Sequence, residues 1–230
     1  MQPKTKRKFL FLLVSLLLLF FFYPFVQRSP AGIYILDIVF LVILLSSTYT
    51  ISERKKVFII SLILALTAFG STVLNYPLKT VSLHLVSVSA YGLFFILMAV
   101  TILSTIFKAK KVTIETIYAS ICVYLLLGIV WTMLYSAIEI IEPGSFLAGG
   151  APVVDFHGEP VARNVFANFI YYSFVTITTL GYGDIIPVSP QARALSALEA
   201  VIGQLYIAVL IAGLVGMHIG QAGTDNANSE

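Results

Sequence analysis

The sequence predicts an all-α membrane protein with six transmembrane helices, one re-entrant helix and a loop that follows it. Hydrophobic residues make up 59% of the 230-residue chain and charged residues 11%, with a mean hydropathy of +0.97. Soluble domains, in contrast, carry about 25% charged residues. Six apolar runs are also long enough to cross about 30 Å of hydrocarbon. They cover residues 9–26, 33–51, 57–75, 81–107, 114–141 and 194–220.

The first apolar run follows a basic cluster, Lys4, Lys6, Arg7 and Lys8, which could also begin a signal peptide. No cleavage site of small residues follows the run. Its removal would also leave five crossings, with the two chain ends on opposite sides. We therefore expect residues 9–26 to be the first span, with the basic cluster at the cytoplasmic face.

Lysine and arginine residues alternate between the two sides of the membrane. Ten of the fourteen lie in three clusters, at residues 4–8, 54–56 and 108–111. Basic residues mark cytoplasmic connections, so we expect a multi-pass protein of the cell membrane with both termini in the cytoplasm. The net charge of +3 comes from these clusters and indicates contact with anionic lipid rather than with nucleic acid. The other four basic residues, Arg28, Lys79, Arg163 and Arg193, then lie outside.

A shorter apolar segment, residues 165–178, leads into the motif TTLGYGD at residues 178–184. The segment is too short to cross the hydrocarbon, which predicts a re-entrant helix. Backbone that is not helical is tolerated at membrane depth only where protein buries it or where it lines water. Gly181 and Gly183 permit positive φ angles, which can turn successive carbonyl groups toward one axis. Such carbonyls can replace the water around a dehydrated cation.

The motif and its surroundings carry a resemblance to a known family. Residues 114–220 resemble the pore domain of the tetrameric potassium channel family, most closely over YYSFVTITTLGYGDIIP at residues 171–187. The six-span layout is similar to the voltage-gated-like branch. The resemblance implies a potassium-selective channel that conducts K⁺ passively. Because one filter segment cannot enclose an ion, it also implies a homotetramer with closed symmetry. A nonselective monovalent cation channel with the same Gly-Tyr-Gly filter is the alternative.

The resemblance assigns the ion-coordinating residues. K⁺ is expected to bind the backbone carbonyls of Thr179, Leu180, Gly181 and Tyr182 and the Thr179 hydroxyl, with Gly183 completing the filter. Leu180 replaces the more usual Val or Ile. Its side chain is expected to point away from the ion, so selectivity should survive.

The residues that support the filter are assigned in the same way. We expect Tyr171 to reach Asp184 and Tyr172 to reach the Tyr182 hydroxyl, and Thr178 is a further support residue. Both tyrosines could instead belong to an interfacial belt. Some family members carry a carboxylate at the position of Val175 that also binds the equivalent of Asp184, and this chain has none.

The last span holds the gate candidates. Gly203 stands at the family's hinge position, 24 residues after Thr179. A glycine inside a helix costs about 1 kcal/mol relative to alanine, so either bending or close helix packing should justify it. Ile207, Ile211 and Val215 recur every four residues and could form a constriction that closes by dewetting, although any lipid-facing span offers such a stripe.

The fourth span contains no basic residue between 81 and 107. A voltage sensor needs several charges in the field, each worth about 2.3 kcal/mol per 100 mV, so we expect little or no voltage gating. Lys108, Lys110 and Lys111 follow the span and are expected to anchor it at the interface.

Several ionisable residues lie outside the motif. Asp37 and His84 fall at similar depths and could pair or be hydrated separately. Glu199 is expected to pack against the pore helix or a neighbouring subunit, and His218 to lie at the interface. The remaining candidates, Asp155, His157 and Glu159, could bind a metal but more often form a solvated loop.

The chain is expected to divide into three parts. Residues 1–111 form a compact four-helix peripheral domain, voltage-sensor-like but without sensor charges, residues 112–222 form the pore domain, and residues 223–230 form a short cytoplasmic tail. No catalytic set, phosphate loop or cofactor motif is visible, so we expect no enzyme, no cofactor beyond filter K⁺ and no small-molecule substrate. A transporter with four filter repeats in one chain is disfavoured by the single motif. Cys122 is the only cysteine, which excludes an intrachain disulfide.

Overall fold

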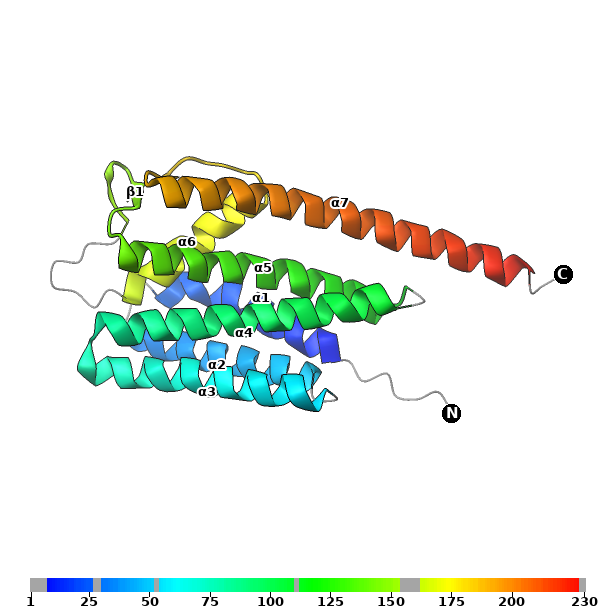
Figure 1. The fold of residues 1–230 in the computed structure, drawn as a ribbon, viewed down its shortest axis with the longest axis horizontal. Helices are drawn as coiled ribbons and strands as arrows, with labels where there is room; N and C mark the ends of the chain where they lie inside the picture. The colour runs from blue at the N-terminus through cyan, green and yellow to red at the C-terminus, as the bar shows by residue number, and fades with distance from the viewer. Residues whose placement is uncertain (1–7, 27–29, 52–53, 110–111, 154–161, 228–230) are drawn as a thin grey trace.

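The computed structural model describes residues 8–26, 30–51, 54–109, 112–153 and 162–227, with side chains omitted at 23–26, 30–36, 162–165 and 214–227. These residues form seven helices and three short strands (Figure 1). The helices are α1 (Lys8–Val26), α2 (Pro30–Thr50), α3 (Lys55–Leu78), α4 (Val81–Lys108), α5 (Ile114–Ile141), α6 (Ala162–Ile177) and α7 (Pro190–Ala227). The strands are β1 (Phe146–Ala148), β2 (Ala151–Pro152) and β3 (Ile185–Pro187).

Each predicted span coincides with a helix. Within the described residues, four helices are long and apolar enough to cross a membrane, namely α3, α4, α5 and the part of α7 from Pro190 to Gly213. The described apolar parts of α1 and α2 are shorter, at Lys8–Phe22 and Asp37–Thr50. The prediction of six crossings therefore has support for four and otherwise stays a prediction.

Local sequence signals explain where the helices of the pore region begin. Thr113 caps α5, because its hydroxyl accepts a hydrogen bond from the Thr116 backbone N–H at 3.3 Å while the Thr116 side chain binds back. The α7 helix begins four residues before the predicted span. Ser189 caps it through a 3.2 Å bond from the Ala192 N–H, and Pro190 occupies the first helical position, where its missing N–H costs nothing.

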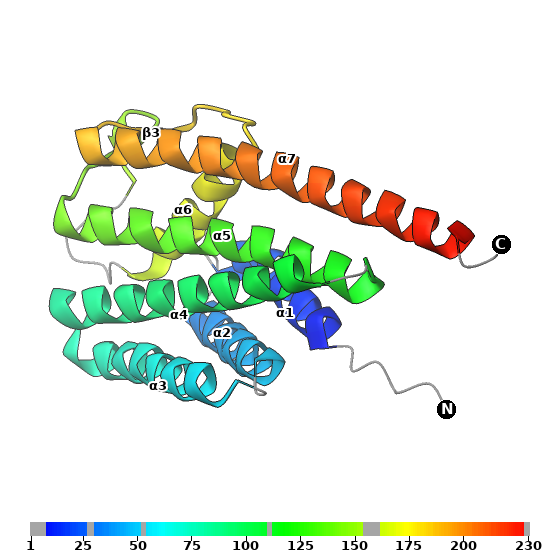
Figure 2. The same cartoon turned by 45° about the vertical axis from the view of Figure 1, so that its right-hand side comes forward.

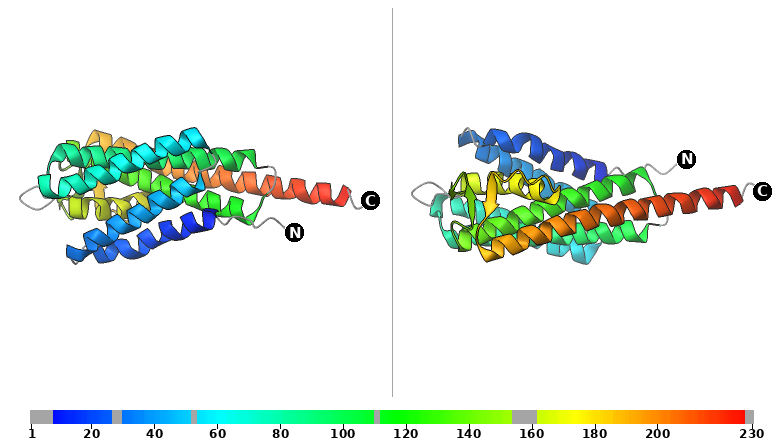
Figure 3. Two further views of the ribbon diagram at one scale, coloured as in Figure 1. Left: turned by 90° about the horizontal axis from the view of Figure 1, so that it is seen from below. Right: turned by 90° about the horizontal axis from the view of Figure 1, so that it is seen from above.

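The peripheral helices pack as two pairs. The α1 helix lies along α2, α3 lies along α4, and α2 touches α3 only over a short stretch. Both α1 and α4 also pack against α5, and one hydrophobic cluster runs through all five helices. Seen from above in Figure 3, α1 and α2 (blue) lie to one side of α5 and α7. Helices α1 to α4 thus share their core with α5, and the division of the chain at residue 111 stays a prediction.

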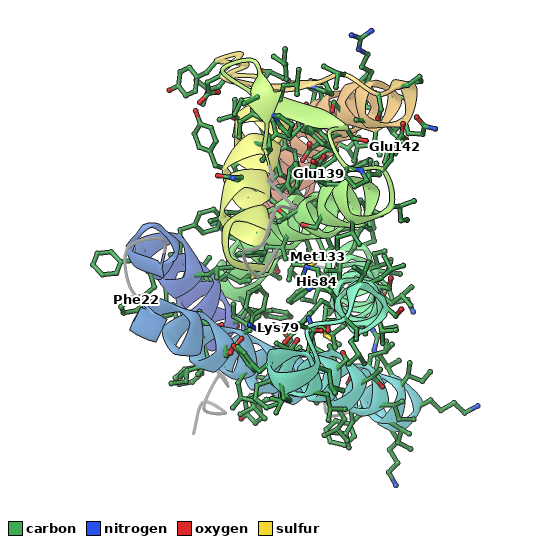
Figure 4. The ribbon with its side chains drawn as sticks, turned by 90° about the vertical axis from the view of Figure 1, so that its left-hand side faces the viewer. Phe22, Lys79, His84, Met133, Glu139 and Glu142 are labelled. Atoms are coloured by element: carbon green, nitrogen blue, oxygen red, sulfur yellow. The ribbon has the colours of Figure 1, made fainter. Side chains whose placement is uncertain are left out.

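The α7 helix covers the opposite side of α5 from α4 (Figure 2). The start of α1 and the end of α7 lie at the same end of the molecule (Figure 1). The turn from α3 to α4 and the small sheet lie at the other end, which faces the viewer in Figure 4. Which of the two ends faces the cytoplasm stays a prediction.

The small sheet is absent from the all-α prediction. Strand β1 pairs antiparallel with both β2 and β3, with Phe146 opposite Pro187 and Leu147 opposite Ile186. Strands of two or three residues are too short to show alternating hydrophobicity, so they cannot be recognised from the sequence of a Gly- and Pro-rich loop. The sheet joins the loop after α5 to the chain that follows residues 178–184.

Candidate ion-conducting segment

Helix α6 carries the filter segment, which we define as residues 178–184. One face of α6 is buried, and its apolar part, Phe166–Ile177, is shorter than a membrane span, as the sequence predicts. Gly128 of α5 makes room for this helix, because a Cβ atom there would lie 2.3 Å from Cζ of Phe174. The Ser173 hydroxyl also donates a 2.8 Å hydrogen bond to the Gly128 carbonyl. The start of the filter segment is therefore fixed by close contact between α5 and α6.

The backbone of the filter segment alternates in the sign of φ. The φ angles are +60° at Thr179, +60° at Gly181 and +77° at Gly183, whereas Leu180 and Tyr182 lie outside the positive region. Alternation of right- and left-handed conformations turns successive N–H groups to one side of the chain. The N–H groups of Leu180 and Gly181 both donate to the Val175 carbonyl, at 2.9 and 3.2 Å. The sequence predicted positive φ at the two glycines, and both have it.

Carbonyl directions follow from these bonds. In a trans peptide the C=O points opposite to the N–H of the same unit. The N–H groups of Thr179, Leu180 and Gly181 all bond to carbonyls of α6. The carbonyls of Thr178, Thr179 and Leu180 therefore point away from α6. Residues 178–184 are exposed in the single chain, so this row of acceptors lies at the surface, where the Thr178 carbonyl also accepts from the Thr179 hydroxyl.

Thr179 is the strained residue of the segment. A positive φ is rare for a β-branched residue, and such strain costs about 1–3 kcal/mol and gathers at functional sites. The Thr179 N–H donates to the Thr176 carbonyl at 2.9 Å, and its hydroxyl donates to the Thr178 carbonyl at 2.7 Å. The Gln204 amide of α7 approaches the same hydroxyl at 3.5 Å. Sequence reasoning missed Gln204, although a lone amide in an apolar span is a usable signal.

The far end of the filter segment is held at Asp184. The Tyr171 hydroxyl donates a 2.6 Å hydrogen bond to Asp184, the contact expected from the sequence. The other carboxylate oxygen accepts from the Ile185 N–H at 3.1 Å. Strand β3 begins at Ile185, so its pairing with β1 fixes the chain directly after Asp184.

A buried carboxylate supports the sheet from α5. Glu139 accepts hydrogen bonds from the backbone N–H groups of Gly144 at 2.8 Å and Phe146 at 3.1 Å. Glu139 and Glu142 lie at the end of α5 beside the sheet (Figure 4). Phe146 in turn packs on the rings of Tyr135, Phe169 and Tyr172. The loop after α5 is thereby tied to the side of α6 that faces α5.

The expected contact between Tyr172 and the Tyr182 hydroxyl does not occur within the single chain and otherwise stays a prediction. The Tyr172 hydroxyl bonds to the Ser196 hydroxyl of α7 at 2.7 Å. Tyr172 is buried, whereas the Tyr182 side chain is 66% exposed, so the two rings have different surroundings. The tyrosine thus links α6 to α7 rather than to the filter.

Gly203 sits against the base of the filter segment. A Cβ atom there would lie 2.5 Å from Cγ1 of Ile177 and 2.6 Å from the Ile177 carbonyl oxygen. Of the two explanations for this glycine, the structure supports close packing. Ile207 is half-buried and Ile211 is exposed, while the side chain of Val215 lies outside the described residues. Their role as a gate remains a prediction.

A groove runs beside the filter segment. Its lining includes Phe20 of α1, Phe174 of α6, and the exposed side chains of Leu180 and Tyr182. The rings of Phe20 and Phe174 meet edge to face at 4.5 Å between centroids. Helix α1 therefore reaches the helix that carries the filter, a contact that the sequence did not indicate.

The other ionisable candidates have mixed outcomes. Asp37 accepts a hydrogen bond from Tyr76 of α3, and Nε2 of His84 has no hydrogen-bond partner among the described residues. The two residues therefore do not pair. No cluster of metal-binding side chains occurs in the described part of the chain. Further candidates lie outside the residues or side chains described: Arg28, Lys110, Lys111, Asp155, His157, Glu159, Arg163 and His218.

Comparisons with known proteins agree with this site. Residues 119–218 match a family model described as an ion channel, a region that includes most of α5, all of α6 and the filter segment. Two pore potassium channel c of Oryza sativa subsp. japonica is 33% identical over 92 residues, which are 40% of this chain and 16% of that protein. No solved structure matches the chain. Over these residues the chain is therefore similar to ion channels rather than to enzymes, and its long apolar helices are those of a membrane protein.

Proposed function

We propose that four copies of this chain form a homotetrameric channel that conducts K⁺ in preference to Na⁺. The observation that carries the proposal is the alternating backbone of residues 179–183, in which the N–H groups of Thr179, Leu180 and Gly181 bond to α6 and the carbonyls of residues 178–180 point away from it. Backbone carbonyl rings of this kind coordinate dehydrated K⁺ in selectivity filters. Thr179, Leu180, Gly181 and Tyr182 supply the carbonyls, and Gly183 allows the chain to leave the filter.

Four copies are proposed because each chain has one filter segment, whose carbonyls at residues 178–180 point to one side, and because the channel family that residues 114–220 resemble is tetrameric. A closed ring with identical contacts satisfies all copies at once. The exposed filter segment and the lightly covered α7, only 11% of whose apolar span is buried, are the surfaces that such a ring would cover.

Voltage is not proposed as the stimulus. Helix α4 carries no basic residue before Lys108 in its last turn. A charge at that edge crosses little of the field, whereas steep gating uses about 3–4 charges per subunit at about 2.3 kcal/mol per 100 mV each. Open probability should therefore vary weakly with voltage. Currents in planar bilayers stepped between strongly negative and positive potentials test this, and a steep sigmoidal activation curve would contradict it.

Purified protein in liposomes tests conduction and selectivity together. With K⁺ inside and Na⁺ outside, the reversal potential should approach the K⁺ equilibrium potential, and mass measurement in mild detergent should give four chains. A reversal potential near zero would instead favour a nonselective cation channel. A monomer or dimer without flux would refute the proposal. The double variant Asp184→Ala/Tyr182→Ala, purified by the same procedure, serves as the nonconducting control.

A further inference from the structure

A carboxyl group is completely buried where α5, α6 and α7 meet. Glu199 of α7 is 0% exposed. Its Oε2 accepts a hydrogen bond from the Tyr135 hydroxyl of α5 at 2.5 Å, and its Oε1 lies 2.5 Å from the Ser173 hydroxyl of α6. Nothing in the proposed conduction path uses this group, yet both of its oxygens are engaged by different helices.

The hydroxyl protons around Glu199 can be counted. Ser173 has one proton, and its oxygen lies within hydrogen-bond distance of both Oε1 and the Gly128 carbonyl. A carbonyl can only accept. A neutral carboxylic acid satisfies every group: Tyr135 donates to Oε2, the acid O–H donates to Ser173, and Ser173 donates to Gly128. An ionised Glu199 would leave one hydroxyl proton shared between two acceptors, and a buried charge without a cation is costly.

The neighbouring contacts connect this cluster to the filter segment. Three successive residues of α6 reach three different partners: Tyr171 binds Asp184, Tyr172 binds Ser196, and Ser173 binds Glu199. Ser196 and Glu199 are one helical turn apart on α7. The last α6 residue before the filter segment, Ile177, follows Ser173 by one turn and touches Gly203 of α7. A shift of α7 relative to α6 must therefore alter these bonds or move the filter segment.

We infer that Glu199 is a positioning residue which, as a neutral acid, ties α7 to α5 and α6 and so holds the filter segment in its conducting form. The inference rests on the proposed function. A glutamine in place of Glu199 should preserve the same bonds, because its amide can donate to Ser173 and accept from Tyr135. An apolar side chain of similar size cannot do either.

Single-channel recordings in planar bilayers with symmetric K⁺ measure the effect. Glu199→Gln should keep the mean open time within about two-fold of wild type. Glu199→Leu should change the mean open time by roughly ten-fold and leave the unitary conductance unchanged. A ten-fold change is in the range of ordinary coupling between sites. Ser173→Ala and Tyr135→Phe should each shift open time in the same direction as Leu, and they carry the test if Glu199→Leu does not assemble. Ser136→Ala, which removes a buried hydroxyl bonded only within α5, is the matched control and should have no effect.

Open times equal to wild type in Glu199→Leu, Ser173→Ala and Tyr135→Phe would overturn the inference, as would Gln and Leu variants that behave alike. A changed unitary conductance in Glu199→Gln would also overturn it, because that result indicates ion contact. Infrared difference spectra separate this failure from failure of the channel itself. The difference spectrum of wild type minus Glu199→Gln should contain the carbonyl band of a protonated carboxyl group whether or not current flows. Absence of this band would refute the inference that Glu199 is a neutral acid. Wild-type protein that shows the band but passes no current would refute the proposed function instead.

Discussion

Gly203→Ala tests how α7 supports the filter segment. The new Cβ atom would lie 2.6 Å from the Ile177 carbonyl oxygen and 2.5 Å from its Cγ1. The side-chain atom can rotate away, but the carbonyl belongs to the backbone one residue before Thr178. Favourable nonbonded contact requires about 3.5 Å, so helix α7 or the end of α6 must move by roughly 1 Å.

The energies of the substitution oppose each other. Alanine in place of glycine favours a helix by about 1 kcal/mol, whereas overpacking costs about 1–3 kcal/mol. The substitution therefore destabilises the arrangement in which α6 and α7 are in contact, by a net amount of up to about 2 kcal/mol. A penalty of one to two kcal/mol changes a population by about 5–30-fold. We therefore expect K⁺ flux per tetramer to fall by about that factor.

Potassium flux from liposomes and thermal unfolding of the same preparation measure the result. Gly70→Ala is the matched control, since its Cβ in α3 would meet nothing within 4 Å, and it should leave flux unchanged. Wild-type flux and unfolding temperature in Gly203→Ala would refute the packing argument. Gly203→Pro separates packing from bending, because proline kinks a helix but carries the same Cβ. Sustained flux in that variant would favour a hinge.

Three further predictions concern the surroundings of the filter segment. Tyr171→Phe removes the 2.6 Å bond to Asp184 at nearly constant volume, so single-channel open stability should change while the tetramer stays assembled, and unchanged kinetics would count against the pairing. Gly128→Ala places a Cβ 2.3 Å from the Phe174 ring, which should lower stability by about 1–3 kcal/mol in thermal unfolding, and equal stability would contradict the close contact. Gln204→Leu removes the amide 3.5 Å from the Thr179 hydroxyl and should lower unitary conductance in bilayers, whereas an unaltered conductance would place this residue outside the ion path.

The sequence predicted the parts of the fold that depend on period and length. Apolar runs predicted the helices α1 to α6 to within three residues, because hydrophobicity and helix propensity act in the same direction along each run. Helix α7 begins four residues before the predicted span and ends seven residues after it. The motif at 178–184 predicted the positive φ angles of Gly181 and Gly183, since only glycine adopts them at little cost. The contact between Tyr171 and Asp184 followed from the family resemblance rather than from the residues alone.

Contacts between helices could not be read from the sequence. The Tyr172 side chain combines an apolar ring with a polar hydroxyl. The sequence around it therefore does not indicate whether the hydroxyl reaches the filter segment or α7. The partners of Glu199, Tyr135 and Ser173, lie 64 and 26 residues away, and no local pattern connects them. The position of α1 against α6 depends on how rings such as Phe20 and Phe174 fit, which is a property of packing in three dimensions.

The exposed face of α7 is covered either by lipid or by a neighbouring chain. An apolar helix face gains nothing by leaving lipid for another apolar surface, so exposed residues such as Leu205 and Val209 are compatible with both. The filter segment is different, because exposed carbonyls at membrane depth require water, an ion or protein. Gln204 lies on α7 beside Thr179 and is also exposed. Lipid cannot satisfy that amide or those carbonyls, so the side of α7 that carries Gln204 must face water, an ion or protein. In the proposed channel, copies related by rotation about the row of carbonyls would cover this side of α7 and enclose an aqueous path beside Gln204.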